Sequence, residues 1–85
     1  MNNYSFLNEE DLAFLEDIKN CAKSQIDFRL SYNSCSFLIE PIGEEIEVWQ
    51  FGNKLGSYKT LDCFLNEFLL DGKPFIERIA NVDFA

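Results

Sequence analysis

Residues 26–32 read IDFRLSY, and this stretch decides the fold class of the chain. Apolar and polar side chains alternate along it, which is the pattern of a half-buried antiparallel strand. The residues before it follow a different period, because apolar side chains recur there at spacings of three and four, as on one face of a helix. That apolar stripe consists of Leu12, Leu15, Ile18 and Ala22. We therefore predict an N-terminal helix that leads into a sheet.

The predicted helix begins at Asn8 and ends near Ser24. Asn is a favourable N-cap residue, and the three carboxylates of Glu9, Glu10 and Asp11 favour the positive end of the helix dipole.

Downstream of this helix the sequence predicts an antiparallel meander of three or four strands. Turn residues separate the apolar segments and set the strand limits. Strands are predicted at Ile26–Tyr32, Cys35–Glu40, Glu45–Phe51 and Ser57–Lys59, with turns at Asn33-Ser34, Pro41–Gly43 and Gly52–Gly56.

Two further helices are predicted after the meander. Thr60 caps the first, whose apolar face runs from Leu61 to Leu69, and Asp71-Gly72 stops it. Pro74 opens a third, short helix. In the tail, Val82 and Phe84 are placed to pair with an edge strand. The predicted fold is a single α+β domain over residues 1–85: an N-terminal helix, a three- to four-stranded antiparallel meander and two C-terminal helices.

The amino-acid composition argues against several classes of function. The 85 residues carry 15 Asp+Glu against 7 Lys+Arg, a net charge of −8, and no His. Free-standing nucleic-acid binding needs a basic footprint, so we expect no direct nucleic-acid contact. Histidine-based acid–base or metal chemistry is excluded. No apolar run approaches the ~20 residues of a membrane helix, so no membrane partner is expected.

The cysteines and glycines show no chemical motif. Cys21, Cys35 and Cys63 form no CxxC pair, which predicts reduced thiols in a cytoplasmic protein rather than a zinc site or a disulfide framework. Gly52 and Gly56 lack the lysine and serine of a phosphate-binding loop. We therefore predict a protein that is not an enzyme and has no cofactor.

Acidic residues are concentrated in the first part of the chain. Residues 1–47 hold ten acidic and three basic side chains, whereas residues 48–85 hold five and four. On the helix, Glu9/Glu16 and Glu10/Asp17 are seven apart and form two carboxylate rows. A second group comprises Glu40, Glu44, Glu45 and Glu47. Such an array can imitate a phosphate backbone toward a basic groove, or it can simply keep a small apolar protein in solution.

Three aromatic residues lie on the last predicted hairpin: Trp49, Phe51 and Tyr58. If Ile46 and Val48 face the core, Trp49 and Phe51 point outward beside carboxylates. An aromatic anchor within a charged rim is typical of an interaction hot spot. Alternatively, the sheet is covered on both faces, or a bulge reverses the alternation.

The segment SYKTLD of residues 57–62 continues through Phe68 to LDGKPFI of residues 70–76. This part resembles the C-terminal part of short acidic proteins of bacterial mobile elements and phages, in which a strand and an amphipathic helix precede an (I/L)DGK(S/P)-type turn and a final short helix. The resemblance implies a small α+β domain in the context of mobile DNA. By analogy, small acidic proteins in that context are often inhibitors of host defence, of anti-CRISPR or anti-restriction type.

We therefore expect a protein-binding module that occupies a basic, nucleic-acid-binding surface of a partner protein. The alternatives are an antitoxin or immunity-type protein, and a structural homodimer joined through Trp49 and Phe51. The candidate partner-binding residues are Glu9, Glu16, Asp17, Glu40, Glu44, Glu45, Glu47, Trp49, Phe51 and Tyr58.

Overall fold

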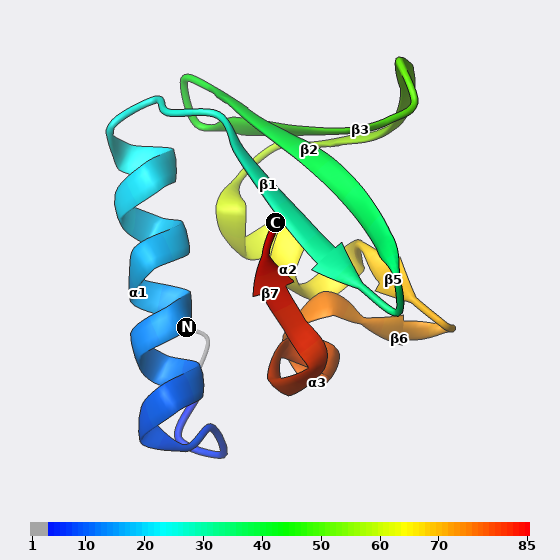
Figure 1. Cartoon of the computed structure of the whole chain (residues 1–85). Coiled ribbons are helices and arrows are strands. Elements are labelled where there is room, and N and C mark those ends of the chain that lie inside the picture. Colours follow the sequence, from blue (N-terminus) through cyan, green and yellow to red (C-terminus); the bar gives the residue numbers. More distant parts are fainter. Residues whose placement is uncertain (1–3) are drawn as a thin grey trace.

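The fold is α+β, as predicted, in a computed structural model that describes residues 4–85. Helix α1 stands beside an antiparallel sheet, and the smaller helices lie below the sheet in the view of Figure 1. The elements in chain order are α1 (Glu9–Lys23), β1 (Phe28–Tyr32), β2 (Cys35–Ile42), β3 (Glu45–Gln50), β4 (Asn53–Tyr58), α2 (Leu61–Glu67), β5 (Leu69–Leu70), β6 (Lys73–Pro74), α3 (Phe75–Arg78), a 3₁₀ helix (Ile79–Asn81) and β7 (Val82–Phe84).

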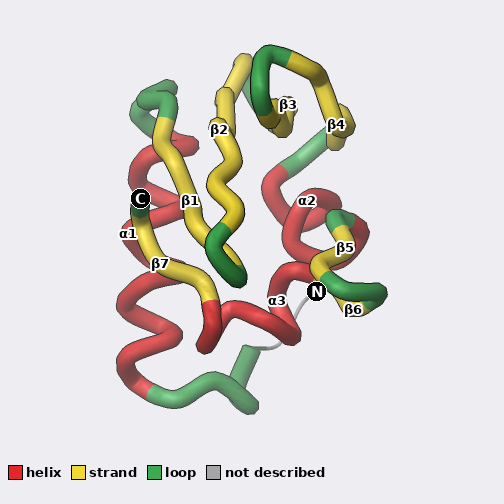
Figure 2. The backbone as a smooth tube through the Cα atoms, turned by 45° about the vertical axis from the view of Figure 1, so that its right-hand side comes forward, coloured by secondary structure: helices red, strands yellow, loops and turns green. Residues whose placement is uncertain are grey.

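The main sheet has five strands in the order β4-β3-β2-β1-β7. β1 to β4 form the predicted meander, and the C-terminal strand β7 returns to pair with β1, with Leu30 opposite Phe84. Figure 2 shows β7 beside β1 and the small β5–β6 hairpin apart from the main sheet. The prediction that Val82 and Phe84 pair with an edge strand is therefore confirmed.

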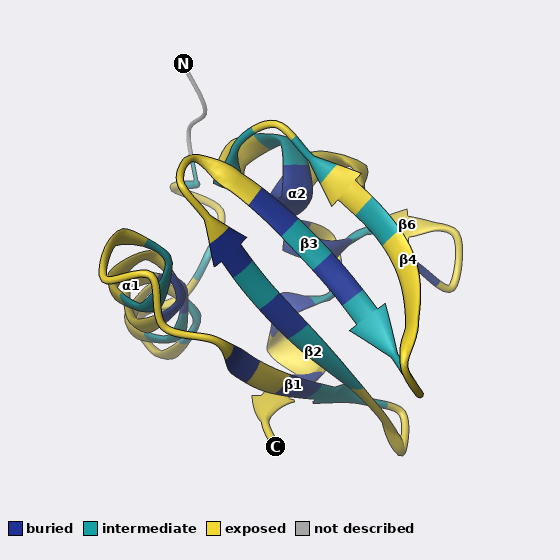
Figure 3. Ribbon diagram, turned by 90° about the horizontal axis from the view of Figure 1, so that it is seen from above, coloured by how far each residue is buried: buried dark blue, intermediate teal, exposed yellow. Residues whose placement is uncertain are grey.

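The hydrophobic core lies between one face of the sheet and the helices. Phe64 is fully buried, and its ring stacks on Phe68 at 5.4 Å and meets Phe75 at 5.0 Å between centroids. Of the predicted stripe on α1, Leu15 and Ile18 are buried, whereas Leu12 is 42% exposed. The sheet contributes Phe28, Leu30, Ile39, Ile46 and Val48. The helices of residues 4–85 pack behind or beside the sheet, and none of them covers its opposite face (Figure 3).

Both predicted helix caps are confirmed. The Asn8 side chain accepts a hydrogen bond from the Asp11 amide at 2.8 Å, and the Thr60 hydroxyl accepts one from the Cys63 amide at 3.1 Å. Each cap satisfies an amide that has no partner within its helix.

The predicted turn at Asn33-Ser34 is confirmed, with φ of 52° and 67°, but the predicted break at Pro41 is wrong. Pro41 lies inside β2, opposite Ile46 on β3. A proline has no N–H to give to a sheet neighbour. It is tolerated here because the pairing of β2 with β1 ends at Ile39, so β2 has only one partner strand at Pro41.

The predicted turn at Gly52–Gly56 is also wrong. The chain reverses over two residues, Phe51 and Gly52, with φ of 51° and 77°, and β4 begins at Asn53. The predicted fourth strand is therefore too short, and Phe51 lies in a turn instead of on β3. A register shift between Val48 and Trp49 accommodates Leu55 as an extra residue on β4.

The second helix is shorter than predicted. α2 ends at Glu67, since Phe68 has an extended backbone with ψ of 117°. Asp71 and Gly72, predicted as a helix stop, form the turn of the β5–β6 hairpin with φ of 51° and 79°. A turn with positive φ at both positions is the usual connection of a two-residue hairpin.

Candidate interaction surface

We call the uncovered side of strands β1 to β4 the open face. It carries most of the candidate partner-binding residues that were predicted to lie on strands. Figure 3 looks onto it, with α2 and α3 behind the sheet and α1 along one side. The register places Arg29, Leu38, Trp49 and Lys54 in one row across the four strands. Ile46 and Val48 are buried in the core, and the Trp49 indole donates a hydrogen bond to Glu47, so Trp49 points away from the core, beside carboxylates.

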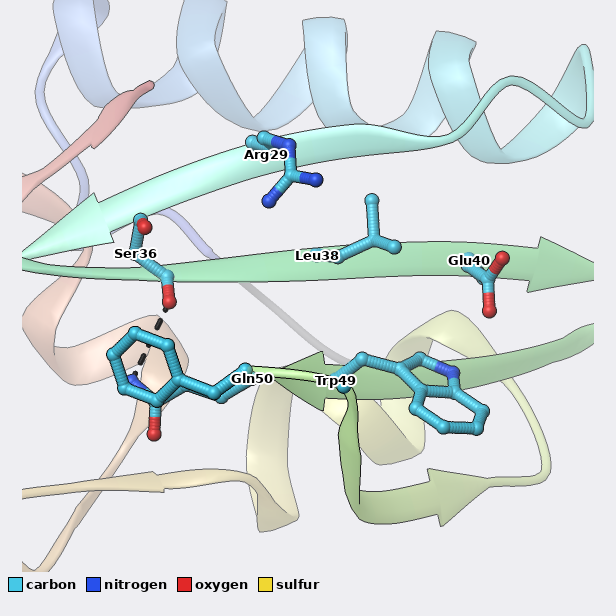
Figure 4. A pocket seen from close by; sticks show the side chains of 8 residues that line it. Arg29, Ser36, Leu38, Glu40, Trp49 and Gln50 are labelled. Carbon is cyan, nitrogen blue, oxygen red and sulfur yellow. Dashed lines mark hydrogen bonds between the residues drawn. The ribbon is translucent and has the colours of Figure 1, made fainter.

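A depression of about 560 Å³ is hollowed into the open face. Leu38 of β2 lies between Arg29 of β1 and Trp49 of β3 (Figure 4). On one side of Leu38, Gln50 donates a hydrogen bond of 3.4 Å to the carbonyl of Ser36. The lining residues are Arg29, Ser36, Leu38, Glu40, Trp49, Gln50, Phe51 and Gly52.

Two glutamates of neighbouring strands lie opposite each other at one end of this depression. Glu40 on β2 is directly opposite Glu47 on β3. The Glu47 carboxylate has two partners: its Oε2 lies 3.0 Å from Lys54 Nζ, and its Oε1 accepts a 3.3 Å hydrogen bond from the Trp49 indole. Among residues 4–85, Glu40 makes no such hydrogen bond or ion pair, although it is partly buried. Like charges directly opposite on a sheet are destabilising.

The β2–β3 turn extends this negative charge. Glu44 and Glu45 are both exposed there, and Glu45 is opposite Ile42. Gln25 fixes the turn through paired bonds with Gly43: its Nε2 donates to the carbonyl at 2.9 Å, and its Oε1 accepts from the amide at 2.7 Å. The acidic turn is therefore held in place from the α1–β1 connection.

Phe51 is the least expected residue of the surface. Its side chain is 89% exposed, and its φ of 51° lies in the left-handed region that a bulky residue rarely adopts. An Asn at this position before Gly52 would suit the turn better. The sequence therefore places an exposed aromatic ring where both solvation and backbone conformation disfavour it.

The remaining candidate residues lie elsewhere. Tyr58 is on the covered side, where its ring packs against Phe64 and Phe68 at 5.8 and 6.2 Å, and burial followed by the charge of Glu67 raises its pKa. The three candidates on α1 are exposed but do not line the depression: Glu9, Glu16 and Asp17.

Sequence reasoning missed Arg29, Leu38 and Lys54 as part of this surface. Strand alternation could have indicated the first two, because Arg29 sits between buried Phe28 and Leu30, and Leu38 precedes buried Ile39. Lys54 was hidden by the misplaced turn at Gly52–Gly56.

We also searched the described residues for a metal site, for disulfides and for a membrane-spanning helix. Residues 4–85 bring together no cluster of three or more His, Cys, Asp or Glu side chains that could hold a metal ion. Cys21, Cys35 and Cys63 are free thiols. Within the same residues, no helix has the length and apolar character needed to cross a bilayer.

In comparisons with known proteins, no family model, no curated protein and no solved structure matches this chain.

Proposed function

We propose that this chain is a non-enzymatic protein-binding module that docks its open face on a basic surface of a partner protein. The observation that carries the proposal is the depression on that face, which joins an apolar centre to an unpaired carboxylate. Leu38 and Trp49 supply the apolar area, and Glu40 supplies a charge without a counter-ion. A partner cation beside Glu40 would give this carboxylate the kind of counter-ion that Glu47 has in Lys54.

Two residues on this face stand where general rules of protein stability disfavour them, which supports a role in binding. Glu40 opposite Glu47 is one of them. The other is the exposed Phe51 with its left-handed backbone. Proteins tend to violate local rules where a functional site requires it.

The net charge of −8 and the resemblance of residues 57–76 to proteins of mobile elements and phages together favour one class of partner. We propose a nucleic-acid-binding defence protein of the bacterial host, whose basic ligand site this chain occupies in the cytoplasm. A negative surface accelerates encounter with such a site and competes with its nucleic acid.

The test is capture of a partner by the immobilised full chain from a bacterial lysate, identified by mass spectrometry. We expect a protein that Trp49→Ala fails to retain and that Glu77→Gln, an exposed change on α3, retains fully. In surface plasmon resonance, Trp49→Ala should mainly raise the dissociation rate, because a desolvated aromatic anchor acts on complex lifetime.

Reversal of Glu44, Glu45 and Glu47 to Lys should slow association and reduce its salt dependence, because screening confines exposed-charge attraction to roughly 8 Å at 0.15 M salt. Binding that ignores both salt and the triple reversal would show that the acidic residues serve only solubility. A captured toxin would instead identify an immunity-type protein, and a dimer lost on Trp49→Ala would identify a self-associating subunit.

A further inference from the structure

The open face is polarised along its strands. Glu40, Glu44, Glu45 and Glu47 lie toward the β2–β3 turn, whereas Trp49 and Phe51 lie toward the β3–β4 turn. Phe51 directly follows β3 and is six positions beyond Glu45, and at about 3.3 Å per residue six positions correspond to roughly 20 Å. A partner segment that follows the strands would meet negative charge first and aromatic rings last.

The depression has the width of one row of side chains. Ser36, Leu38 and Glu40 of β2 form its base, between Arg29 of β1 and Trp49 of β3. β1 and β3 flank β2, so they lie about 9.5 Å apart, which is two strand spacings. A ridge of side chains from one partner element can enter between Arg29 and Trp49 (Figure 4).

We propose that the segment seated in this depression is a basic amphipathic α-helix of the partner, lying along β2; this inference rests on the proposed function. Residues four apart on a helix are separated by about 6 Å along the axis, which matches the roughly 6.6 Å between Leu38 and Glu40. A helix can therefore set an Arg or Lys over Glu40 and an apolar side chain over Leu38 and Trp49 at position i+4. At 1.5 Å per residue, about 13 residues span the face.

A helix is favoured over an extended segment by its backbone. The face of a sheet offers no backbone donors or acceptors, because these are used between strands, so an extended segment laid across it would bury unpaired N–H and C=O groups. A helix satisfies its own interior groups. Charge disfavours two other occupants. A second copy carries the same net charge of −8, and nucleic acid would bring its phosphates against the Glu40 and Glu47 carboxylates.

The experiment uses a yeast-displayed library of helical peptides of about 14 residues, randomised over Arg, Lys, Leu, Phe, Ser and Glu, and selected on the full chain. We expect enriched peptides with a basic residue at i and an apolar residue at i+4. Synthetic versions should bind Glu40→Gln about tenfold more weakly and lose most affinity for Trp49→Ala, while Glu77→Gln binds normally. A peptide of the same composition, with its basic residues moved to the opposite helix face, should not bind.

Three results would overturn the inference: no enrichment, enriched sequences without the i, i+4 pairing, or binding that is insensitive to both Glu40→Gln and Trp49→Ala. The proposed function is judged separately, from the natural partner captured in the lysate. If hydrogen exchange shows that partner protected in a loop or strand by a Trp49-dependent contact, the helix inference is wrong and the proposed function stands. If Trp49→Ala retains every lysate protein that the wild type retains, the proposed function is wrong, whether or not the peptides bind.

Discussion

Glu40 and Glu47 lie directly opposite each other on β2 and β3, and within residues 4–85 only Glu47 has an ion-pair partner, Lys54, at 3.0 Å. The register therefore places two acidic residues side by side on the open face of the sheet. Two polar groups, the Lys54 ammonium and the Trp49 indole N–H, contact the Glu47 carboxylate, whereas within residues 4–85 the Glu40 carboxylate has no such partner.

Neutralising this pair should stabilise the isolated protein. We expect Glu40→Gln to raise the free energy of unfolding by about 0.5 kcal/mol, because the repulsion across the strands is removed. Urea denaturation at low ionic strength measures the change, and Glu77→Gln on α3 is the matched control. In 1 M salt, where the screening length is about 3 Å, the gain should shrink. A less stable Glu40→Gln would mean that the carboxylate has a structural role.

Replacing the residue with the unfavourable backbone conformation at the β3–β4 turn should also stabilise the isolated protein. Phe51→Asn places the preferred residue before Gly52 at a φ of 51°, and it removes a ring that is 89% exposed. We expect a gain of about 1 kcal/mol in stability together with weaker partner binding. Thermal melting and the capture assay report the two effects. Lower stability would show that the ring contributes to folding despite its exposure.

Truncation in the aromatic cluster should be far more damaging. Phe64 is fully buried and packs against Phe68 and Phe75, so Phe64→Ala should cost about 3–5 kcal/mol. For a small domain this is a large part of a total stability that is typically about 5–15 kcal/mol. Phe6→Ala, at a ring that is 63% exposed, is the control and should change stability by less than about 1 kcal/mol. An unchanged melting temperature for Phe64→Ala would contradict the assigned core.

The contact between Tyr32 and Asp71 should be lost at high pH. The Tyr32 hydroxyl donates a 2.9 Å hydrogen bond to Asp71 Oδ2, and this bond, with burial and the carboxylate charge, raises the pKa of Tyr32 above 10.0. Only the neutral phenol can donate, so the stabilisation is complete below pH 10 and disappears as the pH rises through the raised pKa. Absorbance titration near 295 nm should show one phenol ionising earlier in Asp71→Asn than in the wild type. Identical titration curves would contradict the contact.

The regular elements could be predicted because their signals are local. The period of the apolar residues identified α1 and the strands, and the Asn8 and Thr60 caps marked helix starts through bonds to amides only three residues ahead. The turn at Asn33-Ser34 was found because both residue types tolerate tight hairpins.

The errors arose where tertiary contacts override local preference. Phe51 adopts a backbone conformation that its own chemistry disfavours, so no propensity could place the turn there. Pro41 is acceptable in β2 only because β1 stops short of it, which depends on the pairing of distant residues. For the same reason the depression was not foreseen: its base at Leu38 and its walls at Arg29 and Trp49 are joined by register, which the sequence does not display.

The return of β7 to β1 has a consequence for synthesis on the ribosome. Val82–Phe84 pair with residues 30–32 on the outer edge of β1, and the Ala85 amide donates to the carbonyl of Arg29 at 3.0 Å. At about 5–20 residues per second, the partner of β1 is made roughly 3 to 11 s after β1 itself. During that interval one edge of β1 remains open to chaperones or to strands of other nascent chains. The order of translation thus makes β7 the strand that completes the pairing of β1.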